Sequence, residues 1–329
     1  MKRKCMRKLG KLSLVLVLVL GMAFSAAGCG NSGGSAEQKE EKKTEEKKES
    51  SEKKSKEKDL TIDETVLVDW EGLKVTATSI ENDEYSKEPA IKLLIENDTE
   101  YGISIAVSKL FVNGCYMPDA YFGVNLCDVP AGKKANETLP LNPSSDEFLK
   151  KAGIDTVGSV DVEFTVRDSS KDYYDDSSVL YTSDVANIQT SAYDNMDTDA
   201  IAEGTELYNQ NGVRIVAKEL SAFSSMDYGL YLYVENTTDM DIILQSYDVS
   251  VDGFVPEEGG DMNSFEIPAG TYSVDALVIW YDETVPDESA VEDVKEMQLG
   301  LKIFDAANWF YGYDDEGLIA DTGMLTYTP

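Results

Sequence analysis

Apolar and polar residues alternate along several short stretches of this chain, and one such stretch occurs twice. IKLLIENDTEYGI runs from Ile91 to Ile103, and LYLYVENTTDMDI runs from Leu230 to Ile242. In both, every second residue is apolar up to a shared Glu-Asn-x-Thr sequence. A period of two predicts a β-strand with one face in a core and the other facing water. The two tyrosines of the second copy, Tyr231 and Tyr233, are therefore expected on the water-facing side.

Turn residues follow these strands at regular intervals. Asn97 and Asn236 close the two matched strands, where we expect a residue that tolerates left-handed backbone geometry. Asn113-Gly114 and Asp252-Gly253 are strong hairpin signals. The first copy also predicts one short helix, with a capping-box start in 144–147 and a stop at Gly153.

Further blocks repeat in the same order, at an offset that drifts only from 140 to 137 residues. The matched pairs are EGLKVTA (71–77) with NGVRIVA (211–217), FVNGC (111–115) with VDGF (251–254), VPAG (129–132) with IPAG (267–270), and residues 154–168 with 291–305. Repeats of this length predict two copies of one module. About seven short strands in each copy are typical of an antiparallel β-sandwich. We therefore expect an all-β chain with two tandem immunoglobulin-like β-sandwiches.

The N-terminus predicts the location of the protein. A basic segment precedes an apolar run from Leu12 to Ala27, which ends at Gly28-Cys29. This order is typical of a secretory signal, and the run is shorter than the ~20 residues of a membrane-spanning helix. Its A-A-G-C ending resembles the lipobox of bacterial lipoproteins. That resemblance implies cleavage before Cys29, lipidation of Cys29 and anchoring on the extracytoplasmic face of the cell membrane.

The predicted organisation has five parts. Residues 30–58 contain no aromatic or large aliphatic residue, so this segment is expected to be a disordered Lys/Glu-rich tether. The predicted parts are a signal peptide (1–28), a tether (29–58), a first module (59–190), a linker (191–203) and a second module (204–329). The linker is long enough to form either a hinge or a short helix.

The order of these motifs resembles the telokin-like immunoglobulin-fold domains of Gram-positive lipoproteins. The resemblance covers both modules and rests on the opening strand, the Glu-Asn-x-Thr turn, the hairpins and the (V/I)PAG corner. It implies the fold, and it implies no catalytic residue or defined ligand, because a fold does not determine a function.

Charge excludes several classes of partner. The formal net charge is −33, and the first 58 residues contain 15 of the 29 basic residues but only eight of the 62 acidic ones. Residues 59–329 therefore have a net charge near −40. Such acidity argues against nucleic acid as a partner and against a module lying flat on anionic lipid.

The composition also excludes common catalytic systems. The chain has no histidine, so Ser-His-Asp and Cys-His catalysis and His-ligated metals are excluded. No phosphate-binding or nucleophile-elbow motif stands in a strand-turn-helix context. We expect a protein that is not an enzyme and has no cofactor.

Two cysteines remain in the modules, and both differ between the copies. Cys115 matches Phe254, and Cys127 matches Phe265. Because both positions change type together, we expect the two sites to touch, as a sulfur pair in one copy and an aromatic pair in the other. The pair is either a disulfide, which an extracytoplasmic compartment permits, or two buried thiols.

Equivalent acidic and aromatic loops follow the last long strand of each copy, at 168–178 and 305–317. Oxygen-rich loops suit Ca²⁺, although neither has the EF-hand order, so a solvated loop is the simpler interpretation. The weak Ca²⁺ candidates are Asp168, Asp175, Asp176, Asp305, Asp314 and Asp315. The aromatic residues either bind a glycan or protein, or belong to the core; they are Tyr173, Tyr174, Trp309, Phe310, Tyr311 and Tyr313.

The sequence thus predicts a membrane-anchored, non-enzymatic binding module of the cell envelope. Its partner would be an envelope protein or glycan of unknown identity. The alternative is a structural spacer or accessory subunit with no ligand of its own. The pattern leaves the oligomeric state open.

Overall fold

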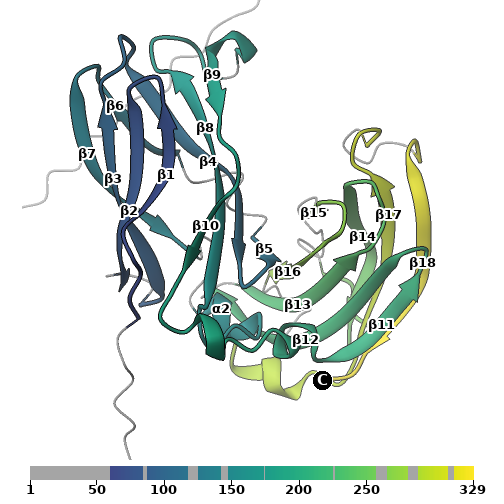
Figure 1. Ribbon diagram of the computed structural model, residues 1–329. Helices are drawn as coiled ribbons and strands as arrows, with labels where there is room; N and C mark the ends of the chain where they lie inside the picture. The colour runs from purple at the N-terminus through teal and green to yellow at the C-terminus, as the bar shows by residue number, and fades with distance from the viewer. Residues whose placement is uncertain are drawn as a thin grey trace, which may run out of the picture. The chain divides into compact units, whose positions relative to one another are not determined.

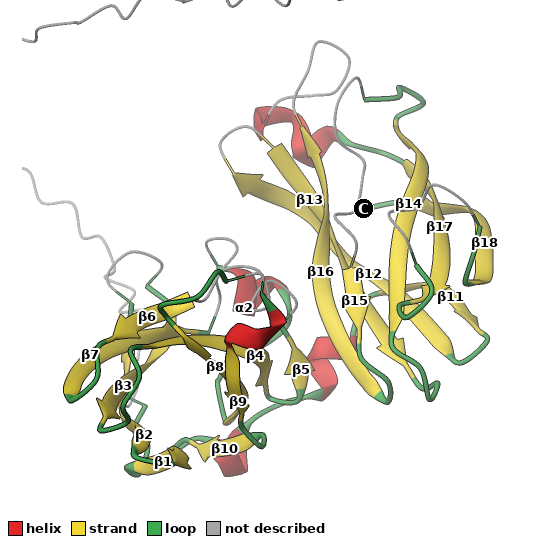
Figure 2. Ribbon diagram, turned by 90° about the horizontal axis from the view of Figure 1, so that it is seen from above, coloured by secondary structure: helices red, strands yellow, loops and turns green. Residues whose placement is uncertain are grey.

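The computed structural model shows a chain built almost entirely of β-strands (Figures 1 and 2). It describes residues 60–83, 87–117, 125–141, 147–173, 175–224, 227–256, 265–280, 288–309 and 315–329. The predicted signal and tether lie outside these residues. The part from Glu57 to Pro329 forms one compact unit. Within the described ranges, no helix is long and apolar enough to cross a membrane.

Two sheets enclose the core of the first module. One has the strand order β1-β2-β3-β7, formed by Thr65–Trp70, Leu73–Asn82, Pro89–Asn97 and Lys133–Pro140. The other contains β4 (Ile103–Val112), β6 (Asn125–Val129), β8 (Ser159–Asp168), β9 (Val179–Thr182) and β10 (Ala186–Gln189). Alternate residues such as Ile91, Leu93 and Phe164 are almost fully buried between them.

The second module repeats this arrangement around a core of its own. Its first sheet has the order β11-β12-β13-β16, formed by Thr205–Gln210, Val213–Ser224, Asp227–Asn236 and Thr271–Trp280. Its second sheet has the order β15-β14-β17-β18, formed by Phe265–Ile267, Ile242–Val251, Met297–Asp305 and Leu318–Tyr327. The antiparallel pairing within layered sheets confirms the predicted all-β sandwich class.

The two copies also share local details of strand pairing. The first hairpin of each has a β-bulge at the same place, between Val66 and Val68 in β1 and between Glu206 and Tyr208 in β11. Asn113 and Asp252 have φ angles of 52° and 50°, and the glycines that follow have φ angles of 81° and 83°. Two successive left-handed residues are what a tight two-residue hairpin requires. The predicted hairpins are confirmed.

The asparagines of the Glu-Asn-x-Thr turns have a different role from the one predicted. Neither Asn97 nor Asn236 has a positive φ. Each is fully buried, and its amide donates to backbone carbonyls: those of Tyr101 and Val129 for Asn97, and those of Met240, Ile267 and Pro268 for Asn236. Its Oδ1 accepts from the backbone N–H and the hydroxyl of the threonine two residues later. The asparagine fastens the turn to the (V/I)PAG corner through buried hydrogen bonds, a role for which backbone geometry is secondary.

The short helix of the first module is α2 (Phe148–Lys151). Its predicted start at 144–146 lies outside the described residues, and Glu147 precedes the helix without a side-chain cap bond. Gly153 ends the helix region with a φ of 84°. A Cβ at this glycine would lie 2.5 Å from the carbonyl oxygen of Ala200, so only glycine allows the linker to approach this closely.

The linker forms short 3₁₀ turns at Tyr193–Asn195 and Asp199–Ala202. Ile201 is fully buried in the core of the first module. Lys218, on β12 of the second module, donates to the carbonyl oxygens of Ala200, Ile201 and Glu203 at 2.6–3.2 Å. These contacts attach the linker to both modules. Two more 3₁₀ turns lie at Asp176–Ser178 and Glu288–Asp293.

Both ends of the first module are bonded together. Ile62 forms an isolated antiparallel bridge with Thr190, and Ser191 N–H donates to the carbonyl oxygen of Thr61 at 2.8 Å. The backbone N–H of Thr61 donates to the Ser191 hydroxyl at 3.2 Å. The chain therefore enters the module beside the point where the linker leaves it.

One strand pair joins the modules into a ten-stranded sheet. β5 (Cys115–Tyr116) continues the β4 hairpin and also pairs in parallel with β16, Cys115 opposite Tyr272 and Tyr116 opposite Ser273 (Figure 1). The Ser273 hydroxyl donates to the Tyr116 carbonyl at 2.6 Å, and the Tyr272 hydroxyl donates to the Asn113 carbonyl at 2.8 Å.

The outer face of the second module's sheet is buried against the first module. Its buried side chains are Val216, Tyr231, Tyr233, Val274 and Ala276, and they belong to the core cluster of the first module. Tyr231 contacts the Phe148 ring at 6.1 Å between centroids, and the Lys151 ammonium lies 5.1 Å from its centroid. The prediction that Tyr231 and Tyr233 face water is wrong, because the first module covers this face.

The matching face of the first module's sheet is more polar. The repeat places Thr76, Lys92, Leu94, Asn136 and Thr138 at the five corresponding positions. Lys92 donates to Thr138 at 3.0 Å across the strands, where the second copy has Tyr231 and Ala276. The copies therefore differ in polarity on the face that the other module covers in only one of them.

Exchanging one residue between the copies tests this assignment. Tyr231→Lys places a charge in the buried interface and removes the Phe148 contact, so it should reduce the free energy of unfolding of residues 57–329 by about 3 kcal/mol. The reciprocal Lys92→Tyr changes a solvent-facing position and should alter it by less than about 0.5 kcal/mol. Urea unfolding measures both values. Similar small effects for the two variants would contradict a buried interface.

Candidate functional site

Both module cysteines are free thiols in the structure. Cys115 pairs with Val112 on one edge of β4, and Cys127 pairs with Ile105 on the same edge, while β8 occupies the other edge. Seven residues of extended strand separate these positions, about 23 Å at 3.3 Å per residue. A disulfide needs Cα atoms less than about 7 Å apart. The predicted contact between the cysteines is wrong, and so is their disulfide.

The surroundings of the two thiols differ as well. Cys115 is fully buried, and burial raises the pKa of its thiol to about 12. Cys127 is half-buried on β6, where burial and the neighbouring Glu137 carboxylate raise its pKa to about 12. A raised pKa keeps the thiol protonated and unreactive. Neither cysteine has the character of a nucleophile.

The match between the copies is correct at both cysteines. Phe254 bridges to Val251 as Cys115 pairs with Val112, and Phe265 pairs with Leu244 as Cys127 pairs with Ile105. Phe254 and Phe265 therefore lie at opposite ends of β14, and the predicted aromatic pair is also wrong. Two positions whose residue types both differ between the copies need not be in contact, because the residue type at each position depends on its own surroundings.

The described residues of the two acidic loops do not gather their carboxylates into a metal site. Within the described part of the chain, no group of three or more acidic or cysteine side chains is placed to hold a metal ion. Asp168 accepts from the backbone N–H and hydroxyl of Ser170, and these hydrogen bonds lower its pKa. Asp175 accepts from Ser177 N–H at the start of the 3₁₀ turn that contains Asp176, which lowers the pKa of Asp175.

The second loop uses its acidic groups in the same local way. Asp305 accepts from Ala307 N–H and from the Asn308 amide. Asp315 accepts from the Lys302 ammonium at 2.7 Å, and Asp314 lies outside the described residues. The carboxylates are occupied by turn hydrogen bonds and an ion pair, so their arrangement gives no support to the predicted Ca²⁺ sites.

The candidate aromatic residues are only partly described. Tyr173 is exposed, and the Arg167 guanidinium lies 4.8 Å from its ring centroid. Trp309 is half-buried. Tyr174, Phe310, Tyr311 and Tyr313 lie outside the described residues, so a shared aromatic platform stays a prediction.

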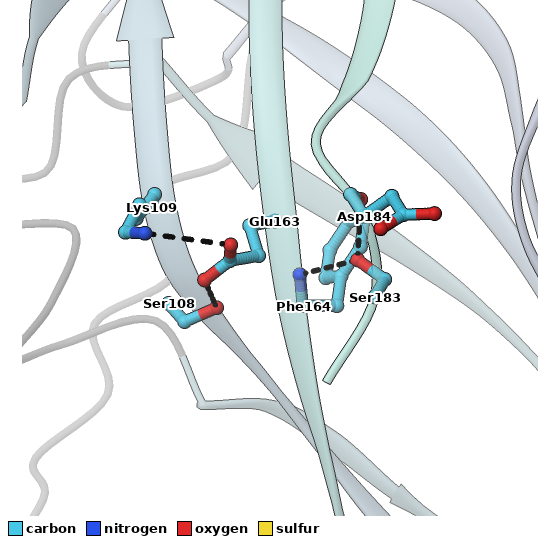
Figure 3. Close-up of polar contacts among 6 residues, drawn as sticks. All are labelled: Ser108, Lys109, Glu163, Phe164, Ser183 and Asp184. Carbon is cyan, nitrogen blue, oxygen red and sulfur yellow. Dashed lines mark hydrogen bonds and ion pairs between the residues drawn. The ribbon is translucent and has the colours of Figure 1, made fainter. Parts of the chain in front are cut away.

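Two neighbouring groups of polar contacts on the first module contain residue types found in catalytic sites but have the geometry of structural contacts (Figure 3). Glu163 accepts from the Ser108 hydroxyl at 2.9 Å and from the Lys109 ammonium at 3.5 Å. Ser183 accepts from Phe164 N–H and donates to the Asp184 carbonyl, so its hydroxyl completes the strand pairing where β9 ends. Neither of these two hydrogen bonds links the Ser183 hydroxyl to a side chain that could act as a base.

One feature of the surface was missed from the sequence. Phe254 and Val255 are 57% and 70% exposed, the two largest values among the exposed large apolar side chains described. They follow the Asp252-Gly253 hairpin, at the position that β5 occupies in the first module. The sequence shows that both residues are apolar, but an alternating pattern does not indicate whether another strand covers the edge of a sheet.

Comparison with known proteins adds little. No protein-family model and no curated protein matches this chain. One solved structure that it resembles is Bacteroides uniformis beta-glucuronidase 2 covalently bound to cyclophellitol-6-carboxylate aziridine. The identity is 10%, the TM-score is 0.20, and the match covers 79% of this chain but 26% of the glucuronidase. A likeness this slight carries no argument about activity.

Thiol labelling tests the placement of the cysteines. The only cysteines in residues 57–329 are Cys115 and Cys127. Alkylation without reductant at about pH 8 should label Cys127 slowly and leave Cys115 unlabelled, because the thiolate is the reactive form and Cys115 is buried. In denaturant, intact-mass measurement should show two labels. A denatured chain that takes no label would show that the cysteines are bonded to each other.

Proposed function

We propose that this protein is a lipoprotein anchored through Cys29 on the extracytoplasmic face of the cell membrane, where its two modules act as a non-enzymatic interaction unit. The anchor is supported by the basic segment, the apolar run and the A-A-G-C ending, with the polar tether that follows. Multiple acyl chains would hold the protein at a membrane, where one chain alone binds only marginally.

The interaction role rests on one observation, the exposed apolar pair Phe254–Val255 on a strongly acidic module. Exposed apolar groups on a sheet edge are a common place for a protein partner to bind. The corresponding edge of the first module, β5, already serves as a joint between protein parts. The second module thus presents the corresponding edge, with which no described strand outside its own hairpin pairs.

A structural spacer is the second candidate. The buried outer face of the β13 sheet and the docked linker support this candidate, because a spacer requires a stiff tandem. A spacer needs no exposed apolar edge, however, so Phe254 and Val255 favour the interaction role.

Membrane fractionation tests the anchor. The wild-type chain should be recovered with the membrane and should incorporate a labelled fatty acid. Cys29→Ala removes the lipid-accepting thiol and should lose the label and shift most of the protein out of the membrane fraction. Cys5→Ala is the matched control and should behave as wild type. Equal membrane recovery of Cys29→Ala would refute lipidation as the anchor.

A pull-down tests the interaction role. Residues 57–329 serve as bait for envelope extract, alongside a Phe254→Ser/Val255→Ser double variant. Because both side chains are exposed, the variant should remain folded, as the unfolding midpoint will show. Wild-type bait should retain at least one envelope protein that the variant retains roughly tenfold less. Identical retention by both baits would favour the spacer.

A further inference from the structure

The exposed edge of the second module, which we call the distal edge (Phe254–Val255), has a defined backbone geometry. Phe254 exchanges both backbone hydrogen bonds with Val251, at 2.8 and 2.9 Å. The next residue on that strand therefore directs its N–H and C=O away from the hairpin. Among the residues that the structure describes, no further strand pairs with this edge.

The first module shows what such an edge accepts. There, Cys115 and Tyr116 occupy the corresponding positions and pair in parallel with Tyr272 and Ser273 of β16. The strand that corresponds to β16 in the first module is β7. It ends its sheet in the order β1-β2-β3-β7, so its outer edge has no partner among the described strands. We call the β5–β16 pairing the formed joint. The distal edge and the outer edge of β7 correspond to its two strands, but they are not paired with each other within the chain.

We propose that the distal edge binds β7 of a second copy of this chain. The register of the formed joint places Phe254 opposite Lys134 and Val255 opposite Ala135. One copy would donate its second module and accept through its first, so the contact is head-to-tail and continues either into a ring or into an open chain of copies. The inference rests on the proposed interaction role and names its partner.

The side chains at the distal edge and at β7 are complementary in charge. In the formed joint, the Tyr272 hydroxyl donates to the carbonyl of Asn113. This acceptor is a backbone carbonyl, so the repeat places the Lys134 ammonium where the Tyr272 hydroxyl lies and the backbone carbonyl of Asp252 where the acceptor lies. The Asp252 carboxylate accepts from Lys295 and Glu296 N–H in its own module, and its negative charge adds a longer-range attraction for Lys134. Lys134 is exposed and pairs with Glu96 in its own module, and a surface ion pair of this kind costs little to exchange for a contact with a neighbouring chain. A lysine over the exposed Phe254 ring adds a cation–π contact.

Lysines on β7 also restrict which edge it accepts. Charged residues on an edge strand oppose pairing with ordinary strands. Lys133 and Lys134 are exposed on β7 of a module that is otherwise acidic. An edge that carries Asp252 compensates this charge, whereas a neutral edge does not.

The contact should be weak and reversible. The formed joint is supported by the buried layer around Tyr231 and Val274, but the first module has Lys92 and Asn136 at those positions. Pairing at β7 therefore lacks the apolar layer. Anchoring copies on one membrane raises their local concentration and compensates for low intrinsic affinity.

Site-specific cross-linking on the full-length anchored protein tests the proposal. Phe254 is replaced by the photoreactive p-benzoylphenylalanine, and the same probe at exposed Met324 on β18 is the control. Irradiation should give a homodimer from position 254, and mass spectrometry should place the acceptor peptide in 133–140. The Met324 probe should give no such product.

Charge variants test the complementarity. Lys134→Glu should reduce the cross-linked dimer roughly fivefold, because it sets like charges opposite each other. Lys150→Glu makes the same change on α2 and should leave the yield unaltered. Asp252→Asn keeps the oxygen that accepts from Lys295 and Glu296 N–H, so it should preserve the hairpin while reducing the yield.

Three outcomes would overturn the proposal. A product with a different envelope protein would exclude self-association and leave the interaction role standing. A homodimer whose acceptor lies outside 133–140 would exclude β7 as the partner strand. The absence of any product at position 254 would exclude self-association, and the pull-down would then decide whether the interaction role survives.

Discussion

Burial of one sheet on both faces is the constraint on which the organisation of this chain depends. The strands β11, β12, β13 and β16 place one set of side chains in their own core and the opposite set against the first module. Each large apolar side chain buried in this way contributes about 1.5–3 kcal/mol. Lys218 can direct its ammonium at three linker carbonyls because the linker is held against the same sheet, and burial lowers the pKa of this lysine. The linker therefore behaves as part of a packed interface.

The Glu-Asn-x-Thr turns are likewise determined by what is buried. Asn97 and Asn236 are buried at equivalent places, and each satisfies its donors and acceptor inside the module. An unsatisfied buried amide would cost about 1–3 kcal/mol. These turns keep their sequence because it completes a hydrogen-bond network, while the outer faces of the same strands are free to diverge. Lys92 and Tyr231 are the clearest instance of that divergence.

The sequence patterns correctly predicted the features that depend on local backbone geometry, namely the strands and the hairpins. Alternation placed Ile91, Leu93 and Ile95 in a core, and Asn113-Gly114 and Asp252-Gly253 marked hairpins with two left-handed residues. Alternation separates two faces of a strand but does not tell whether the second face meets water or another module, so Tyr231 was assigned wrongly. The cysteine pairing failed for a related reason. Cys115 lies where β16 pairs with its strand, and Phe254 lies at an edge with which no further described strand pairs, so neither residue depends on Cys127. Comparing the water-facing positions of the copies, Lys92 with Tyr231 and Asn136 with Val274, carries the signal that was missed.

The bridge between Ile62 and Thr190 has a mechanical consequence. A pull on the chain at Leu60 first meets the backbone hydrogen bonds that join 61–62 to 190–191, and the linker begins at those same residues. These hydrogen bonds connect the start of the first module directly to the start of the linker, so tension can pass between them without crossing the core of the module. While these bonds are intact, the strands of the first sandwich carry less of the load. These hydrogen bonds must break before the first module can extend from its N-terminal end.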